Sequence, residues 1–548
     1  MSALTGTTRL ARLVLRRDRI RLAIWILGTP LLGYALAGSV AGIYPDQEAR
    51  LGYATTSASS LVARAFNGPI HGTDLGAVVV AETYVTLALI VALLSTFAVT
   101  RHTRQNEETG RAELLGANVV GRYAPLTAAL LVIVAANTVA AVLLAVALVG
   151  AGLPLAGSVA AAAAIGGVGV AFTAIAAVTA QLSVTSRGAN ALAAATVGLA
   201  FVLRAAGDVL GEQSADGTRV RSAWPSWISP LGWGNQVRAF DGERWWVLAL
   251  PVALLLAGVA LAYALAERRD QGAGLIAPRR GPATGAPRLL SPTGLAWRMQ
   301  RGTLLGWAVG VAVLGLSMGV AADEFNDMID ANPAAAEAIN AMGGGADLIN
   351  AYLAAMLGLF ALTIGAYVVQ TLLRVRGDEA DGVLEATLAT AVSRTRWLGT
   401  QVLAATLGAV ALLLLAGVTT GLGYGIVTGD PLGQAVELGG AALLRLPALL
   451  VIAGVVTAIF GLLPRWSVVL SWTALLVFLL LGQLGAVLEL PQAALNVSPY
   501  THVPAVPAVD PVALPLVVLA AVAAALLAVG AAAFRHRDVP SWATARAS

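Results

Sequence analysis

Long apolar runs separated by short polar segments make up most of this chain. Six runs occur in each half, and each is close to or above the ~20 apolar residues that a helix needs to cross a bilayer. The pattern therefore predicts an all-α polytopic membrane protein of twelve transmembrane helices, arranged as two fused six-helix repeats. The runs lie near residues 22–42, 76–99, 125–149, 156–182, 189–210 and 246–266, then near 303–322, 351–372, 398–427, 436–463, 467–488 and 512–534.

One polar motif occurs twice, each time directly after the second apolar run of its half. The pattern is Arg-x-x-Glu-x-x-Gly-x-x-Glu with a further arginine nine residues on, and the two copies are 272 residues apart. The remaining sequences of the halves have diverged widely, so five residues kept at the same spacings favour docking to a partner over simple solvation. The members are Arg104, Glu107, Gly110, Glu113 and Arg122, and Arg376, Glu379, Gly382, Glu385 and Arg394.

The spacing within the motif predicts its local structure. Arg104 and Glu107 are three residues apart and can pair on a helix that leaves the membrane. Gly110 then allows a turn, and Glu113 opens a second short helix before Pro125 begins the next span. The simpler interpretation is a local ion pair worth only ~0.2–0.5 kcal/mol.

The start of each half is also duplicated, at an offset of 282 residues. This matters because the arginines of residues 9–21, the apolar run after them and the segment 35–37 (Ala-Leu-Ala) together resemble a cleavable signal peptide. A second copy in mid-chain cannot be such a signal, so we expect both to be membrane helices, with residues 9–20 forming a basic helix on the inner surface. The repeated residues are Arg16, Arg19, Trp25 and Gly28, matched by Arg298, Arg301, Trp307 and Gly310.

Composition excludes several kinds of chemistry. The chain is 58% hydrophobic and 12% charged, and its 34 basic residues are all arginine. Without lysine there is no P-loop lysine and no Schiff base, and without cysteine there is no disulfide, thiol catalysis or thiolate metal site. The four histidines are too scattered to suggest a metal site. We therefore predict no catalytic residues, cofactor or metal in this chain, with any ATP hydrolysis performed by another polypeptide.

The distribution of arginine predicts the orientation. If the N-terminus is cytoplasmic, 26 of the 34 arginines fall on cytoplasmic segments, as the positive-inside rule requires. Both termini and both motifs then face the cytoplasm. Residues 267–301, rich in Pro, Gly and Arg, are predicted to be a cytoplasmic linker between a first half at 1–266 and a second half at 302–548. The polar loops are 101–123 and 373–397.

Charged residues inside predicted spans are costly and can mark function. Arg204 and Asp208 are four residues apart, so an ion pair explains Arg204 without a ligand. Arg445 follows Glu437 by eight residues, about two helical turns, and the same argument predicts a pair there. Glu82 has no acidic companion deep in the first-half spans.

Tryptophans gather in the predicted external segment 211–246. An aromatic belt at the headgroup layer is the favoured interpretation, and an exit gate for an apolar ligand is the alternative. The residues are Trp224, Trp227, Trp233, Trp245 and Trp246.

The first motif resembles a known family. Residues 101–115 resemble the cytoplasmic loop of ABC-2-type transporter permeases, whose pattern is acidic, Gly, acidic, then leucines. The six-span halves, the segment 229–233 (Ser-Pro-Leu-Gly-Trp) and the use of arginine alone look most like actinobacterial permeases of the polyketide-antibiotic (tetronasin-type) and multidrug exporter group. The resemblance covers nearly the whole chain.

The resemblance implies a function and partners. In that family the loop is a coupling helix that docks on a separate ABC ATPase, so two ATPase copies, binding ATP and Mg, are expected per chain. Glu107, Gly110 and Glu113, with their second-half equivalents, are the implied contacts. The chain would be a non-enzymatic permease of the bacterial plasma membrane that exports a hydrophobic or amphipathic compound. The second copy departs from the pattern at Leu373, Ala380 and 386–387, so we expect unequal docking sites.

The family also implies a substrate pathway lined by the first, second and fifth spans of each half. Carried onto this sequence, it points to Glu82, Phe97, Phe201 and Arg204 in the first half and to Tyr367 and Gln370 in the second.

Three other functions stay open. A proton-driven twelve-helix drug transporter would use Glu82 as its proton carrier, although a single buried carboxylate is thin support for a relay. A membrane-embedded enzyme would need clustered His, Asp or Glu near one membrane surface, and the sequence shows none apart from the motifs. An ABC exporter of lipids or cell-envelope components would have the same apolar cavity.

Overall fold

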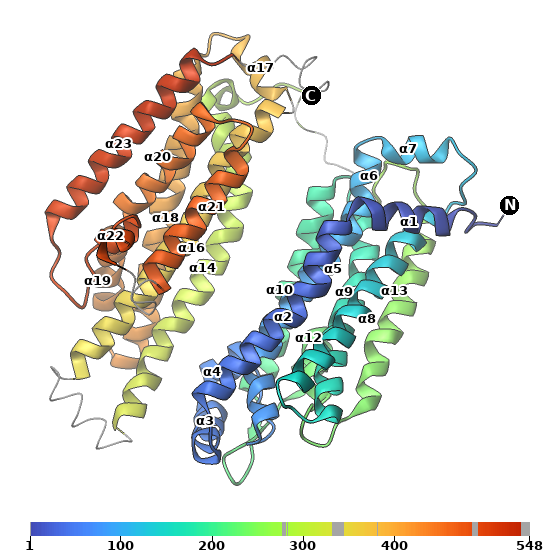
Figure 1. The fold of residues 1–548 in the computed structure, drawn as a ribbon. Helices are drawn as coiled ribbons and strands as arrows, with labels where there is room; N and C mark the ends of the chain where they lie inside the picture. Colours follow the sequence, from blue (N-terminus) through green and yellow to red (C-terminus); the bar gives the residue numbers. More distant parts are fainter. Residues whose placement is uncertain are drawn as a thin grey trace. The chain divides into compact units, whose positions relative to one another are not determined.

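The computed structural model describes residues 2–276, 281, 283–330, 345–380, 382–484 and 491–538. The chain forms two compact units, Met1–Gly281 and Pro282–Ser548. The division between them falls inside the predicted linker (Figure 1). Apart from one short hairpin, the regular structure of the described residues is helical, and the chain is an all-α polytopic membrane protein as predicted.

Unit 1 is a helical bundle built around α9, the most buried of its long helices. Gly166 and Gly169 bring α9 close to α8, because a Cβ on either residue would overlap Ala141 or Asn137. The elements are α1 (Thr7–Arg17), α2 (Arg19–Ile43), α3 (Gln47–Ser59), α4 (Leu61–Phe66), α5 (Leu75–His102), α6 (Arg104–Glu108), α7 (Arg111–Gly116), α8 (Ala124–Gly150), α9 (Leu155–Leu182), α10 (Ser186–Val209), β1 (Glu212–Gln213), β2 (Val220–Arg221), α11 (Trp224–Ile228), α12 (Pro230–Gln236), η1 (Trp245–Leu248) and α13 (Ala249–Glu267).

Unit 2 packs around α18, which lies against α14 and α19. Gly417, Gly421 and Gly425, four residues apart, let the backbone of α19 approach α18 directly. The elements are η2 (Pro287–Leu290), α14 (Pro292–Asp330), α16 (Gly345–Ala380), α17 (Val383–Leu388), α18 (Arg394–Thr428), α19 (Pro431–Leu443), α20 (Leu446–Leu462), α21 (Ser467–Leu484), α22 (Gln492–Leu495), η3 (Pro499–His502) and α23 (Ala513–His536).

All twelve predicted apolar runs are helical in the described residues. Eleven helices there are long and apolar enough to cross a membrane. The remaining run, 467–488, forms α21, whose apolar part Ser467–Gly482 is shorter, and residues 485–490 lie outside the described residues. The count of twelve spans therefore stays a prediction. The tenth run is split into α19 and α20 at residues 444–445.

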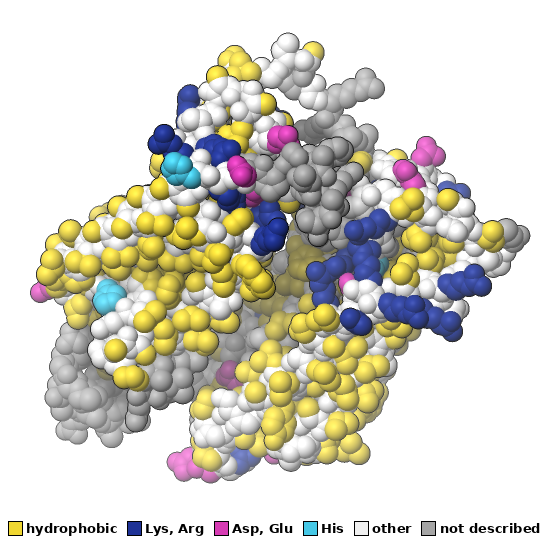
Figure 2. Space-filling view, turned by 45° about the horizontal axis from the view of Figure 1, so that its top comes forward, with side chains coloured by type: hydrophobic (Ala, Val, Ile, Leu, Met, Phe, Trp, Pro, Cys, Tyr) yellow, Lys and Arg dark blue, Asp and Glu magenta, His cyan; other side chains and the backbone are white. Residues whose placement is uncertain are grey.

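The basic residues near the N-terminus form a separate helix, α1. Leu10 and Val14 are buried, with Leu10 packed beside residues at the start of α8, whereas Arg9, Arg12 and Arg16 are exposed. Figure 1 shows α1 lying across the end of unit 1 that also carries α6 and α7. Basic side chains gather over this end (Figure 2).

The tryptophans of the segment 211–246, which is predicted to be external, lie on and around the short helices α11, α12 and η1. Trp224 and Trp246 are largely exposed, and the rings of Trp227 and Trp246 stack at 5.8 Å between centroids. The indole of Trp233 donates a 2.6 Å hydrogen bond to the Trp227 carbonyl. Exposed, partly stacked indoles suit the headgroup layer.

Candidate functional site

Both copies of the polar motif fold as predicted, into a helix end, a turn and a short helix. Gly110 precedes α7 with φ of 71°, and Gly382 precedes α17 with φ of 76°. This left-handed region strains any residue that has a Cβ, which explains why glycine stands at the same place twice. We call the two segments the coupling elements, after the role that the family resemblance implies for them: residues 104–122 in unit 1 and 376–394 in unit 2.

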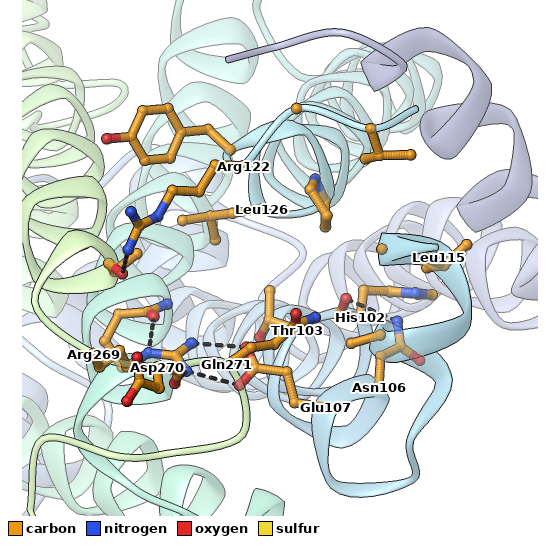
Figure 3. Close-up of a pocket in the computed structure, with 18 residues that line it drawn as sticks. His102, Thr103, Asn106, Glu107, Leu115, Arg122, Leu126, Arg269, Asp270 and Gln271 are labelled. Atoms are coloured by element: carbon orange, nitrogen blue, oxygen red, sulfur yellow. Dashed lines mark hydrogen bonds and ion pairs between the residues drawn. The ribbon is translucent and has the colours of Figure 1, made fainter. Parts of the chain in front are cut away.

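Glu107 is the centre of the first coupling element (Figure 3). Its carboxylate accepts hydrogen bonds from Nη1 of Arg104 at 2.9 Å and from Nη1 and Nη2 of Arg269 at 2.8 and 2.7 Å. The backbone N–H of Gly272 adds a fourth at 3.1 Å. The ion pair predicted between Arg104 and Glu107 is present, but it is only one part of this network.

Arg104 is fully buried although it carries a charge. Its Nε and Nη2 donate to the carbonyl of Ala180, near the end of α9, at 3.1 and 3.0 Å. Nη2 also donates to the carbonyl of Ala273 at 2.9 Å. The start of the predicted linker is thus bound to unit 1, where Leu275 and Ile276 hydrogen-bond to the last carbonyls of α9.

Glu379 occupies the same place in the second coupling element. It accepts a 2.8 Å hydrogen bond from Arg537, and Arg376 lies 3.4 Å away. Arg537 also donates to the Phe460 carbonyl at 3.1 Å, and its guanidinium lies over the rings of Phe460 and Phe534. Burial lowers the pKa of Arg537, and the charge of Glu379 partly offsets this effect.

The final arginine of each motif binds the end of the sixth long helix of its own unit. Arg122 donates to the carbonyls of Ala266 and Glu267, at the end of α13, at 2.9 and 3.1 Å. Arg394 donates to the backbone carbonyls of residues 534, 535 and 537, at the end of α23. Each arginine satisfies carbonyls that the helix leaves unpaired and adds a cation where the helix dipole favours one.

The first coupling element has further contacts that the second lacks the residues to make. Glu108 accepts a 2.9 Å hydrogen bond from the Ser186 N–H at the start of α10, and Ala380 stands in its place in unit 2. Just before the first coupling element, Arg101 pairs with Asp18 at 3.3 Å, and Leu373 stands at the equivalent position in unit 2. The two elements are structurally unequal.

The short helices also differ in what they expose. No residue of α7 is buried, and Leu114 is 73% exposed beside the exposed Glu113. In α17, Leu384 is fully buried and Val383 is 43% exposed. An exposed leucine next to charged residues, at the end of the bundle predicted to be cytoplasmic, is suited to contact with another protein.

A pocket of about 490 Å³ opens beside the first coupling element. Its wall combines His102, Asn106 and Glu107 with Arg122 and Arg269 (Figure 3). The pocket therefore separates α6 and α7 from the start of α8 and the end of α13.

The predicted pathway residues of unit 1 lie on α5 and α10. Phe97 is 45% exposed, whereas Arg204 is fully buried and pairs with Asp208 at 3.1 Å, as the spacing predicted. Arg204 also binds carbonyls at the end of α4 and lies over the Phe201 ring. Burial raises the pKa of the Tyr53 phenol, and the nearby charge of Glu82 raises it further.

The predicted pathway residues of unit 2 lie on α16. Tyr367 is buried in the core, with its ring edge-on to Trp307 at 6.2 Å. Gln370 is exposed and accepts a 2.8 Å hydrogen bond from the Trp307 indole.

The predicted pairing of Arg445 with Glu437 is wrong. The Arg445 guanidinium donates instead to the carbonyls of Ala441, Ala354 and Val506, at 2.8, 2.9 and 3.3 Å. Glu437 is exposed on α19, and the helix breaks at residues 444–445, so the two-turn spacing does not place the side chains together.

Sequence reasoning missed Arg269 and Arg537, although they bind the motif glutamates. Both lie just past the end of the sixth helix of their half, at 267 and 536. Their contacts with Glu107 and Glu379 span 162 and 158 residues. The available signal was an arginine at the same place after each sixth run.

Comparison with known proteins gives two matches. Residues 289–535 match the family model described as the C-terminal domain of the multidrug efflux system permease Rv1217c. The whole chain is 42% identical over 542 residues to the multidrug efflux system permease protein Rv1217c of Mycobacterium tuberculosis (strain ATCC 25618 / H37Rv), covering 98% of this chain and 96% of that protein. The chain therefore belongs to the Rv1217c family of multidrug efflux system permeases.

Proposed function

We propose that this chain is the permease subunit of an ATP-driven exporter in the bacterial plasma membrane. Its cargo would be hydrophobic or amphipathic compounds, with antibiotics of the polyketide type one class to test. The name of the Mycobacterium tuberculosis relative supports multidrug efflux. ATP and Mg would bind to two copies of a separate ATPase, one at each coupling element.

The observation that carries the proposal is the pair of coupling elements. Each has a left-handed glycine, a short helix with exposed residues and a carboxylate network that ties the element to its own half. A force applied to α7 or α17 would reach the ends of membrane helices through these contacts. A transporter driven by two separate ATPase subunits needs two such elements, each able to pass movement to the membrane helices of its half.

The contacts of the motif residues support two separate roles within it. Glu107 and Glu379 are held by arginines of this chain, so they would anchor the coupling elements. The exposed faces of α7 and α17, with Leu114 and Val383, would contact the ATPase. Docking and anchoring can therefore be tested with different variants.

The docking role is tested with Leu114→Asp and Val383→Asp together. Both side chains are exposed, so the permease should fold normally and lose ATPase that copurifies with the unaltered chain. Leu290→Asp is a matched control, because Leu290 is 85% exposed outside the coupling elements. Equal ATPase recovery with the double variant and the control would contradict docking at these helices. Recovery of no ATPase with the unaltered chain would favour the proton-driven alternative.

A further inference from the structure

Two arginines outside the repeated motif make equivalent contacts in the two units. Arg269 follows the end of α13 and binds Glu107, and Arg537 follows the end of α23 and binds Glu379. We propose that Arg269 and Arg537 are positioning residues that transmit movement of each coupling element to the membrane helices of its half. The proposal rests on the proposed function, since the movement would come from the ATPase.

The geometry in unit 1 is a three-way junction. The guanidinium of Arg269 binds both carboxylate oxygens of Glu107, at 2.8 and 2.7 Å, and its Nε donates to Oε1 of Gln181 at 2.8 Å. Gln181 lies at the end of α9, the fourth long helix of unit 1. A two-pronged contact fixes orientation as well as distance. One side chain therefore links α6, which follows the second apolar run, with the ends of α9 and α13, which form the fourth and sixth runs.

The geometry in unit 2 joins the corresponding helices with different atoms. Arg537 binds Glu379 at 2.8 Å and the carbonyl of Phe460 at 3.1 Å. Phe460 lies near the end of α20, and its ring packs 4.8 Å from the guanidinium carbon. The second, fourth and sixth apolar runs again meet at one arginine. Because the two units use different fourth-helix partners, the shared feature is the junction itself.

Gly110, between α6 and α7, is a point at which the first coupling element can bend, with or without the junction. Gly110 has no side chain, and no heavy atom lies within 4 Å of the position that its Cβ would occupy. Rotation at Gly110 can absorb part of a displacement of α7, and the remainder reaches α6. With Glu107 held by Arg269, α6 and the end of α13 must move together.

The test compares two arginines with their exposed neighbours. Arg269→Gln with Arg537→Gln removes both junctions, and Arg268→Gln with Arg535→Gln removes equal charge from exposed positions beside them. Each permease, purified with its copurifying ATPase and reconstituted in liposomes, is assayed in parallel for ATP hydrolysis and ethidium transport. We expect ethidium moved per ATP to fall about tenfold in the junction variant and to stay unchanged in the control.

A distance measurement separates transmission from folding. The chain has no cysteine, so Thr109→Cys at the end of α6 and Ala264→Cys on α13 supply the only two sites for spin labels. The distance between the labels should stay constant on ATP addition in the otherwise unaltered permease and should change when Arg269→Lys is added. Lysine keeps the charge but loses the two-pronged contact.

Two results would overturn the inference. One is equal ethidium moved per ATP in the junction and control variants while their ATPase stays bound. The other is a label distance that responds to ATP in the same way with Arg269 and with lysine. An unaltered permease that binds no ATPase would instead overturn the proposed function, and this inference with it.

Discussion

Replacing Glu107 with alanine should destabilise unit 1 far more than a local ion pair could explain. The substitution leaves Arg104, which is fully buried, and Arg269, whose side chain is 8% exposed, without a carboxylate. Breaking a buried ion pair by removing one partner costs roughly 3–5 kcal/mol. Glu107 is itself 14% exposed at the end of the bundle, so we expect about 2–4 kcal/mol. An isolated pair three residues apart on a helix would be worth only ~0.2–0.5 kcal/mol.

Thermal unfolding of the purified permease measures this difference. The twelve tryptophans of the chain give an intrinsic fluorescence signal in detergent or nanodiscs. Glu113→Ala is the matched control, because Glu113 carries the same charge on the exposed α7. We expect Glu107→Ala to lower the Tm clearly and Glu113→Ala to leave it nearly unchanged. Equal Tm values for the two variants would refute the argument that the network around Glu107 joins three helix ends.

Three further outcomes follow from particular residues. Gly110→Ala should cost about 1–2 kcal/mol of unfolding free energy because Gly110 has a positive φ. Gly198→Ala, inside α10 with open space around it, should be neutral or stabilising, and equal shifts in Tm would contradict this prediction. Arg445→Lys should lower the Tm because one ammonium group cannot replace a guanidinium that donates to three carbonyls. Glu437→Gln should leave the Tm unchanged, and a lower Tm for this variant would support the pairing of Arg445 with Glu437. Burial and neighbouring arginines lower the pKa of His71 to about 3, below the value of about 6.5 in an unfolded chain, so its contribution to stability is complete above pH 6.5 and is lost as the pH falls toward 3. His71→Gln should reduce the fall in Tm between pH 7 and 5, and an unchanged pH dependence would contradict a buried neutral imidazole.

The membrane helices and the local form of the motif were predictable because both depend on nearby residues. A run of apolar residues long enough to span a bilayer becomes a helix wherever it lies. A glycine after a helix end gives a turn through its own backbone, as at Gly110 and Gly382. The ion pair of Arg204 with Asp208 likewise needs only an unbroken helix between them.

The contacts of the motif glutamates were not predictable, because an arginine that recurs after each sixth run does not show which group it binds, and these contacts depend on tertiary structure. Arg269 lies in a segment rich in polar residues and Gly, with no apolar periodicity, and reaches Glu107 only once α5, α9 and α13 have packed. The Arg445 prediction was wrong because it assumed a continuous helix across residues 444–445. The pathway residues stay predictions, since uniformly apolar spans do not show in their sequence which face turns inward.

The mass of the intact complex, purified gently from its native membrane, tests the central claim most directly. The permease chain contributes 55.6 kDa. The account predicts that chain together with two copies of an ABC ATPase. A permease that carries no ATPase would contradict the account and make the proton-driven transporter, with Glu82 as its proton carrier, the leading hypothesis.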